Sequence, residues 1–213
     1  MAKKERKSII MRTPKVTCLI LVVSAISSIS PEIASVFIFD RSAILKCEFW
    51  RILTCHFVHF SNLHLAYNLL AFGIAGCIIE NKDYRHFGQL CILMASLISI
   101  SLFILEPDVS YYGGLSGMAC GSIYYCALWG TSENRSWRTI CMLVIFIVPI
   151  KIAAEICSSA SVLLYWGQQT FVPMPTSHLI GTVVATLHYL IDKYNQTAQA
   201  NRSTRQQEAW RFG

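Results

Sequence analysis

Ser116 stands where a nucleophile could be activated, in the glycine-rich segment of residues 112–117 (YGGLSG). It opens an apolar run, residues 116–129, that is too short to cross a bilayer, so a helix there begins within the membrane. The unpaired N–H groups at the start of such a helix must be enclosed by protein or water, and they form a site for negative charge. A serine there could attack a carbonyl carbon while backbone N–H groups hold the oxyanion. The alternative is a helix-packing segment with an incidental serine.

A candidate base for this serine is His178, near the start of the last apolar run, residues 176–192. An ionisable residue within a span is a candidate functional residue, and a serine needs an adjacent base to become nucleophilic. Small residues recur every four positions in both helices and would allow close approach; they are Gly113, Gly117 and Gly121 in the first helix, and Ser177, Gly181 and Ala185 in the second. If these two ridges face each other, His178 lies within reach of Ser116. The alternative is a structural histidine at the membrane interface.

Two further polar residues, His64 and Asn68, have the i,i+4 spacing that places side chains on one helix face. Both can donate hydrogen bonds, and near Ser116 they would complete an oxyanion hole with its backbone N–H. A competing interpretation is a metal site built from His56, His59 and His64. No HExxH motif and no carboxylate cluster accompany these histidines, so the sequence predicts neither a metal nor an organic cofactor.

The composition indicates what must position these residues. Of 213 residues, 54% are hydrophobic and 14% are charged, whereas a soluble domain carries about 25% charged residues. The basic residues flank apolar runs, which is typical of an integral membrane protein and argues against a nucleic-acid-binding protein. The nine cysteines are scattered without a CxxC pair, so we interpret them as small apolar residues rather than disulfides or zinc ligands.

Six membrane spans are expected. The first, residues 16–39, is interrupted by Pro31 and Glu32, and an aromatic-rich interfacial loop, residues 40–61, follows it. The other five are residues 62–80, 87–105, 116–129, 139–157 and 176–192. A signal peptide with residues 16–26 as its apolar core is the alternative for the first span, but no A-x-A cleavage site follows.

Of the 18 Lys and Arg residues, 14 lie in segments on one side of the membrane in this six-span arrangement. Arg41, Lys46 and Arg51 lie on the other side, and Lys151 lies within a span. This bias predicts that both termini are cytoplasmic, which requires an even number of spans. The predicted organisation is a basic cytoplasmic N-terminus (1–15), a membrane domain (16–192) and a polar cytoplasmic tail (193–213) that frays.

Taken together, these motifs resemble the rhomboid intramembrane serine proteases, over residues 50–190. The resemblance implies a six-helix bundle, a Ser116–His178 dyad without a catalytic aspartate, and a membrane-embedded loop between the first two helices. It assigns oxyanion support to His64 and Asn68. By the same resemblance, Gly114, Gly117 and Gly181 shape the site, His59 is a structural or hydrating histidine, Trp50 and Arg51 belong to the embedded loop, and Glu80 is the acidic residue that closes the second helix.

A narrower resemblance is to the rhombosortase branch of bacterial rhomboids, through residues 50–54 (WRILT), residues 112–117 and the Lys151/Glu155 pair. It implies an inner-membrane enzyme that removes GlyGly-CTERM C-terminal sorting helices from exported proteins. One departure is Cys120, where many rhomboids carry a tyrosine that stacks on the catalytic histidine. We expect tight backbone packing to orient His178 instead, and Lys151 and Glu155 to neutralise each other.

The expected function is therefore a serine endopeptidase whose partners are the lipid bilayer and substrates with transmembrane helices. A general rhomboid protease with other membrane substrates is one alternative. A second is an inactive rhomboid-like protein that binds helices, although such proteins generally lack the serine or the histidine. A third is a transporter or channel, which the absence of inverted repeats disfavours. The sequence leaves the oligomeric state open.

Overall fold

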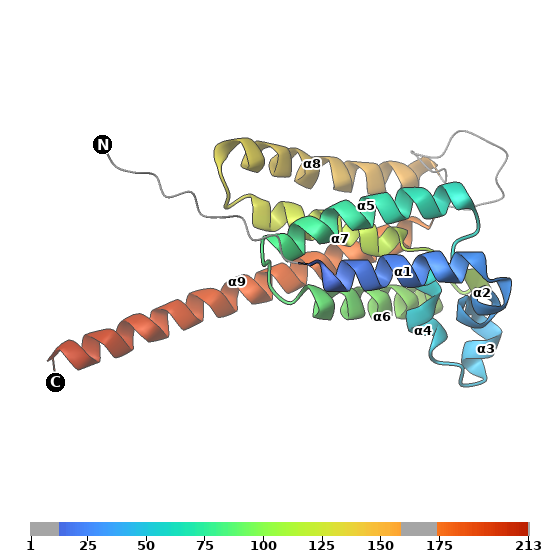
Figure 1. Ribbon diagram of the computed structural model, residues 1–213, viewed down its shortest axis with the longest axis horizontal. Coiled ribbons are helices and arrows are strands. Elements are labelled where there is room, and N and C mark those ends of the chain that lie inside the picture. The colour runs from blue at the N-terminus through green and yellow to red at the C-terminus, as the bar shows by residue number, and fades with distance from the viewer. Residues whose placement is uncertain (1–12, 159–173, 213) are drawn as a thin grey trace.

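The computed structural model describes residues 13–158 and 174–212, and this part of the chain is mostly helical (Figure 1). The predictions for residues 1–12 and for the charge-free segment 159–173 lie outside it. The helices are α1 (Lys15–Ile29), α2 (Pro31–Phe37), α3 (Arg41–Leu45), α4 (Arg51–Thr54), the 3₁₀ helix η1 (Cys55–Phe57), α5 (Asn62–Asn81), α6 (Phe87–Leu105), α7 (Ser116–Gly130), α8 (Arg135–Ser158) and α9 (Pro175–Phe212). Two short strands, β1 (Phe39–Asp40) and β2 (Tyr111–Tyr112), pair antiparallel with Phe39 opposite Tyr112.

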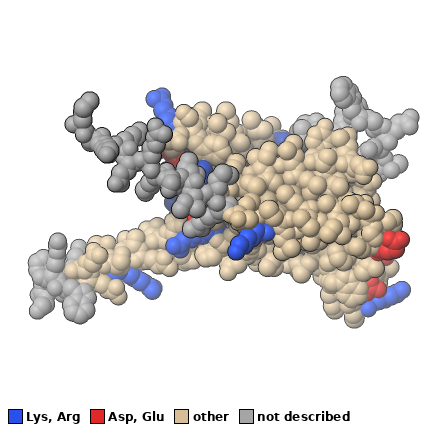
Figure 2. Space-filling view, in the orientation of Figure 1, with Lys and Arg blue, Asp and Glu red and all other residues tan. Residues whose placement is uncertain are grey.

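Three of the described helices, α5, α6 and α8, are long and apolar enough to cross a membrane, and a fourth span results if α1 and α2 are counted together. Apolar side chains such as Leu70, Ile92 and Phe146 are exposed on these three helices. On the face shown in Figure 2, Lys and Arg side chains lie along α9 and near the point where it leaves the bundle, acidic and basic side chains lie at the opposite end of the bundle, and a broad uncharged area lies between. Helix α7, with 15 residues, is shorter than a bilayer requires, and polar residues such as His178 and His188 interrupt the apolar first half of α9, so neither meets the same test.

The expected interruption of the first span is a sharp bend, because α1 and α2 meet at 114°. Pro31 cannot donate the N–H that would continue α1, and Ser30 caps α2 by accepting the Ile33 N–H at 3.3 Å. The start of α1 is held by Glu80, whose carboxylate accepts the N–H of Val16 at 3.0 Å and that of Thr17 at 2.8 Å. Glu80 therefore connects the end of α5 to the start of α1.

Helix α7 is the centre of the core and packs against α5, α6, α8 and α9 (Figure 1). Most of its side chains are buried, and Tyr125 is fully so. The neighbouring helices contribute large buried side chains to the same core, namely Phe72, Ile79, Leu90, Met94, Ile98 and Leu102. A short helix enclosed in this way does not need to match the bilayer thickness, because protein rather than lipid surrounds its ends.

The polar tail differs from the frayed segment that the sequence predicts. Helix α9 continues without a break to Phe212 and projects away from the bundle (Figure 1). Residues 193–212 contain neither glycine nor proline and are rich in Ala, Gln and Arg, which favour helix. Once the buried part of α9 provides a formed helix, extension adds one hydrogen bond per residue without a new nucleation step.

Candidate active site

Ser116 is the first residue of α7, and the backbone before it is held in a fixed shape. Gly114 has φ +140°, a conformation that residues with a side chain rarely adopt. Its N–H donates to the Cys55 carbonyl at 3.2 Å, and the Leu115 N–H donates to Nε2 of His59 at 3.3 Å. His59 therefore has the structural contact that the resemblance implies. Ser116 is partly exposed between buried neighbours, so it lies at the open end of α7.

The two ridges of small residues meet through Gly117, Gly121, Ser177 and Gly181, whereas the predicted member Gly113 lies before α7 and faces the Val58 carbonyl. A Cβ added to Gly117 would lie 2.8 Å from the Ser177 carbonyl oxygen, and one added to Gly181 would overlap the Gly117 carbonyl oxygen. Gly121 faces the Gly181 carbonyl in the same way. Helices α7 and α9 thus cross in direct backbone contact, a distance that only glycine permits at these positions.

This crossing brings together the starts of α7 and α9, which carry Ser116 and His178. One turn further along both helices, Cys120 Sγ lies 3.6 Å from Thr182 Oγ1, and Gly117 beside the serine touches the carbonyl of the residue before the histidine. Among the described residues no hydrogen bond joins Ser116 to His178. Catalytic hydrogen bonds are often long without substrate and shorten in the complex, so the placement is compatible with a nucleophile and its base.

The Nδ1 atom of His178 is directed at helix α8. It lies 2.8 Å from Glu155 Oε2 and 3.1 Å from Lys151 Nζ, and the same two α8 residues form an ion pair at 3.0 Å. Glu155 is only 1% exposed. The sequence predicts the ion pair but not its contact with His178. Two charged residues one turn apart within an apolar helix were the available signal, because charge within a span is rarely incidental.

His64 and Asn68 lie on the other side of the serine, on α5. A Cβ added to Gly114 would be 3.0 Å from His64 Cε1 and 4.0 Å from Asn68 Nδ2, so both side chains lie against the loop that precedes Ser116. Both residues are buried. The Asn68 amide nitrogen has no hydrogen-bond partner within residues 13–158 and 174–212. A buried donor without a partner is available to a bound group, such as a developing oxyanion.

The competing metal interpretation gains no support from the described part of the chain, where no group of three metal-ligating side chains occurs. His56 Nε2 instead lies 2.9 Å from the Ala95 carbonyl and 3.0 Å from Ser99 Oγ. These contacts, between η1 and α6, identify His56 as a structural residue that holds the loop against the core.

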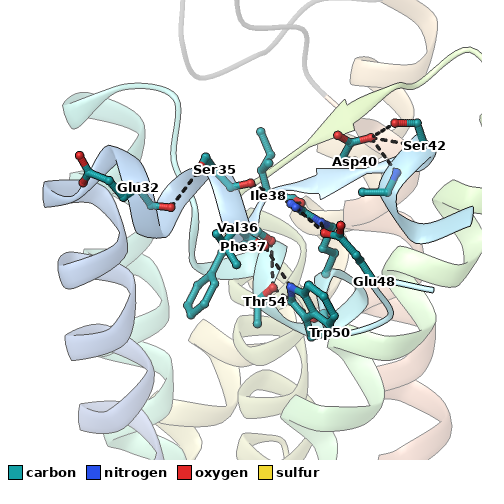
Figure 3. A network of polar contacts seen from close by, with 12 residues as sticks. Glu32, Ser35, Val36, Phe37, Ile38, Asp40, Ser42, Glu48, Trp50 and Thr54 are labelled. Carbon is teal, nitrogen blue, oxygen red and sulfur yellow. Dashed lines mark hydrogen bonds and ion pairs between the residues drawn. The ribbon is translucent and has the colours of Figure 1, made fainter. Parts of the chain in front are cut away.

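Figure 3 shows how Trp50 and its neighbours hold the loop between α2 and α5. Arg51 donates to the carbonyls of Ser35 and Ile38, both at 2.9 Å, and is paired with Glu48 at 2.7 Å. The Trp50 indole N–H donates to the Val36 carbonyl at 3.1 Å. These donors satisfy carbonyls at the end of α2 that have no partner within the helix.

The same loop is fixed at its start by Asp40, which caps α3 by accepting the N–H of Ser42 at 2.9 Å and that of Ala43 at 3.1 Å. The hydrogen bond from the Ser42 hydroxyl lowers the pKa of the Asp40 carboxyl. Trp50 is half-exposed, as expected for an aromatic side chain at a membrane interface.

Comparison with known proteins identifies the region that carries this site. The model of the Rhomboid domain matches residues 46–194, more than half of the chain, and all the candidate site residues fall within it. Among curated proteins, the chain is similar to the rhomboid protease GlpG of Salmonella newport (strain SL254), Salmonella heidelberg (strain SL476) and Salmonella typhimurium (strain LT2). Each is 29% identical over 119 residues, which is 55% of this chain and 42% of the relative. The match therefore spans less than half the length of these relatives.

Proposed function

This chain belongs to the rhomboid family, and we propose that it is an intramembrane serine endopeptidase with Ser116 as nucleophile and His178 as base. The observation that supports the proposal is the contact of α7 and α9 through Gly117 and Gly181, beside the two residues in sequence. The proposal agrees with the name of the similar Salmonella proteins, which are rhomboid proteases. Ser116 is also the partly exposed first residue of the buried helix α7, where an extended substrate strand could reach it.

In the proposed reaction, Nε2 of His178 takes the hydroxyl proton as Ser116 Oγ attacks the scissile carbonyl carbon. The carbonyl oxygen becomes an oxyanion that accepts hydrogen bonds from the Ser116 N–H, His64 and Asn68. As the intermediate collapses, the imidazolium returns the proton to the leaving amine. A water molecule then repeats the sequence on the acyl-enzyme and regenerates the serine.

The membrane arrangement proposed for this chemistry has six spans: the α1–α2 pair, α5, α6, α7, α8 and the first part of α9. Both termini face the cytoplasm of an inner membrane, with the basic segment 1–15 and the tail 193–213 on that side of the domain 16–192. The distribution of Lys and Arg supports this orientation. Ser116 and His178, at the starts of α7 and α9, then lie towards the outer face, from which water enters.

For the substrate, we propose exported proteins that end in a Gly-Gly motif, a transmembrane helix and a basic tail. The resemblance to the rhombosortase branch supports this choice, through residues 112–117 and the Lys151/Glu155 pair. The discriminating comparison uses two reporter substrates in proteoliposomes that differ only by Gly-Gly or Ala-Ala before the helix. Cleavage that depends on Gly-Gly is expected, and equal cleavage of both reporters would assign the chain to the general rhomboid proteases.

The test of the catalytic assignment is reaction with a fluorophosphonate, which labels activated serines. The unmodified protein should be labelled and should cleave the reporter, whereas Ser116→Ala and His178→Ala should do neither while remaining folded. Labelling of Ser116→Ala at the wild-type rate would remove Ser116 as nucleophile. A folded wild-type protein that binds the reporter helix without cleaving it would instead favour the inactive, helix-binding alternative.

A further inference from the structure

We propose that Glu155 is a positioning residue that completes a three-residue chain Ser116–His178–Glu155, in place of a serine–histidine dyad. The proposal rests on the proteolytic function proposed above. It starts from the 2.8 Å contact between Glu155 Oε2 and His178 Nδ1, which joins α8 to α9. The histidine therefore presents Nδ1 to a carboxylate, which leaves Nε2 for the proposed proton transfer from Ser116.

The burial of Glu155 argues against an incidental contact. Its carboxylate is buried, and an ionised carboxylate removed from water is costly unless it is paired and hydrogen-bonded. The two oxygens are divided between two partners: Oε1 lies 3.0 Å from Lys151 Nζ, and Oε2 contacts the histidine. Lys151 thus supplies the opposite charge that stabilises the ionised carboxylate. Oε2 can then accept a hydrogen bond from the imidazole.

A carboxylate at this position selects one tautomer of the neutral ring. Nδ1 of His178 lies near an acceptor, Glu155 Oε2 at 2.8 Å, and a donor, Lys151 Nζ at 3.1 Å, and it can hydrogen-bond with only one of them. We assign Nδ1–H to the shorter contact with the carboxylate, so Lys151 donates to Glu155 Oε1, and Nε2 carries the lone pair that a base needs. When Nε2 takes the Ser116 proton, the ring becomes an imidazolium next to a carboxylate that remains unprotonated. The proton then passes from Nε2 to the leaving amine, so Glu155 is never protonated during the cycle.

This role also accounts for Cys120. A cysteine offers no ring on which His178 could stack, and its Sγ is instead 3.6 Å from Thr182 Oγ1. Thr182 Oγ1 donates back to the His178 carbonyl at 2.8 Å, which holds the backbone and not the imidazole. In the described part of the site, the contact that orients the ring itself is the one between Nδ1 and Glu155 Oε2 on α8, and Lys151 acts through its ion pair with Glu155.

The experiment must separate positioning from simple neutralisation of Lys151. We would compare Glu155→Gln, Glu155→Asp, Lys151→Met and the double variant Lys151→Met/Glu155→Gln in proteoliposomes. The readouts are kcat and KM on the reporter and the rate of fluorophosphonate labelling of Ser116. The matched control is Glu133→Gln, which removes the charge of another ion pair, to Lys82 at 3.0 Å, away from the site.

If Glu155 positions the histidine, Glu155→Gln lowers kcat and the labelling rate by about 10²- to 10⁴-fold, because the amide can stabilise the wrong tautomer. KM stays within about twofold of the wild type, since substrate binding is not touched. Glu155→Asp recovers part of the rate, the double variant stays as slow as Glu155→Gln, and Glu133→Gln behaves as the wild type.

Two results would overturn the proposal: a Glu155→Gln protein within about twofold of wild-type kcat, or recovery of the rate in the double variant, which would reduce the pair to mutual neutralisation. Should Glu155→Gln fail to fold, ¹⁵N NMR of histidine-labelled wild-type protein decides, with His178→Gln for assignment. A proton on Nδ1 of His178 supports the proposal, and one on Nε2 contradicts it. Failure of the proposed function is distinct, because the wild type itself would then neither cleave nor be labelled.

Discussion

Cys120 Sγ lies 3.6 Å from Thr182 Oγ1, and each residue stands one helical turn beyond a proposed catalytic residue, Ser116 on α7 and His178 on α9. The two helices are therefore in register along the contact that carries the site. The register is set by backbone contact between Gly117 and Gly181, so any side chain that separates the helices should also separate the nucleophile from its base.

Cys120→Tyr tests this tight packing. Cys120 is 8% exposed, and the added phenol has no space beside Thr182. Overpacking costs about 1–3 kcal/mol, whereas an aromatic contact with the histidine would return about 0.5–1.5 kcal/mol. We expect a lower melting temperature in detergent and lower activity. Cys18→Tyr, on the exposed face of α1, is the control and should change neither. A Cys120→Tyr protein of equal stability and higher activity would show that ring stacking was the missing element.

Gly181→Ala should act at the same contact with a smaller side chain. The added methyl group would overlap the Gly117 carbonyl oxygen, which cannot move without shifting α7. We expect a loss of about 1–3 kcal/mol in the free energy of unfolding and reduced turnover. At Gly73 on α5 the nearest atom to an added Cβ is Leu21 Cδ1 at 3.4 Å, so Gly73→Ala should be neutral or stabilising. Equal melting temperatures for the two variants would argue against a contact that requires glycine.

Asn68→Ala should lower kcat without abolishing cleavage. Removal of one oxyanion donor costs about 10²- to 10³-fold in rate, and His64 and the Ser116 N–H would remain. The buried Asn68 amide nitrogen has no partner in the described residues, so its loss should leave stability nearly unchanged. Asn81→Ala, at the other end of α5, removes an amide that bonds the Cys77 carbonyl and should leave kcat unchanged. An Asn68→Ala enzyme with wild-type kcat would identify Asn68 as a packing residue.

Glu80→Gln should affect stability more than chemistry. The carboxylate accepts three hydrogen bonds at the start of α1, from the N–H groups of Val16 and Thr17 and from the Thr17 hydroxyl at 2.6 Å. An amide has one accepting oxygen, so at least one donor loses its partner, at a cost of about 1–3 kcal/mol. Thermal unfolding in detergent measures the loss, and the folded fraction should keep wild-type kcat. Glu32→Gln changes an exposed acid at the start of α2 and should have a smaller effect. Unfolding of Glu80→Gln at the wild-type temperature would remove the capping role.

The positions of several helices followed from the sequence alone, because few backbone structures satisfy their hydrogen bonds within lipid. Apolar runs of fixed length predict α5, α6 and α7 to within one residue at each end, since a helix is the structure that satisfies its own backbone in a membrane. The spacing of Gly117, Gly121, Ser177 and Gly181 predicts the α7–α9 contact, because small residues at every fourth position form one face. The candidate site residues follow from motifs that fix side chains within single helices.

Tertiary structure alone decided how helices that are distant in sequence meet. Pro31 marks the break between α1 and α2, but no local pattern specifies its 114° angle, the capping of α2 by Arg51, or the contact of Glu155 with His178. Each depends on the rotation and crossing of separate helices, which the packing of the whole bundle sets. The i,i+4 pair Lys151/Glu155 is visible in the sequence, but its third partner lies 23 residues away on another helix. Its contact with the imidazole therefore becomes apparent only when α8 and α9 are placed side by side.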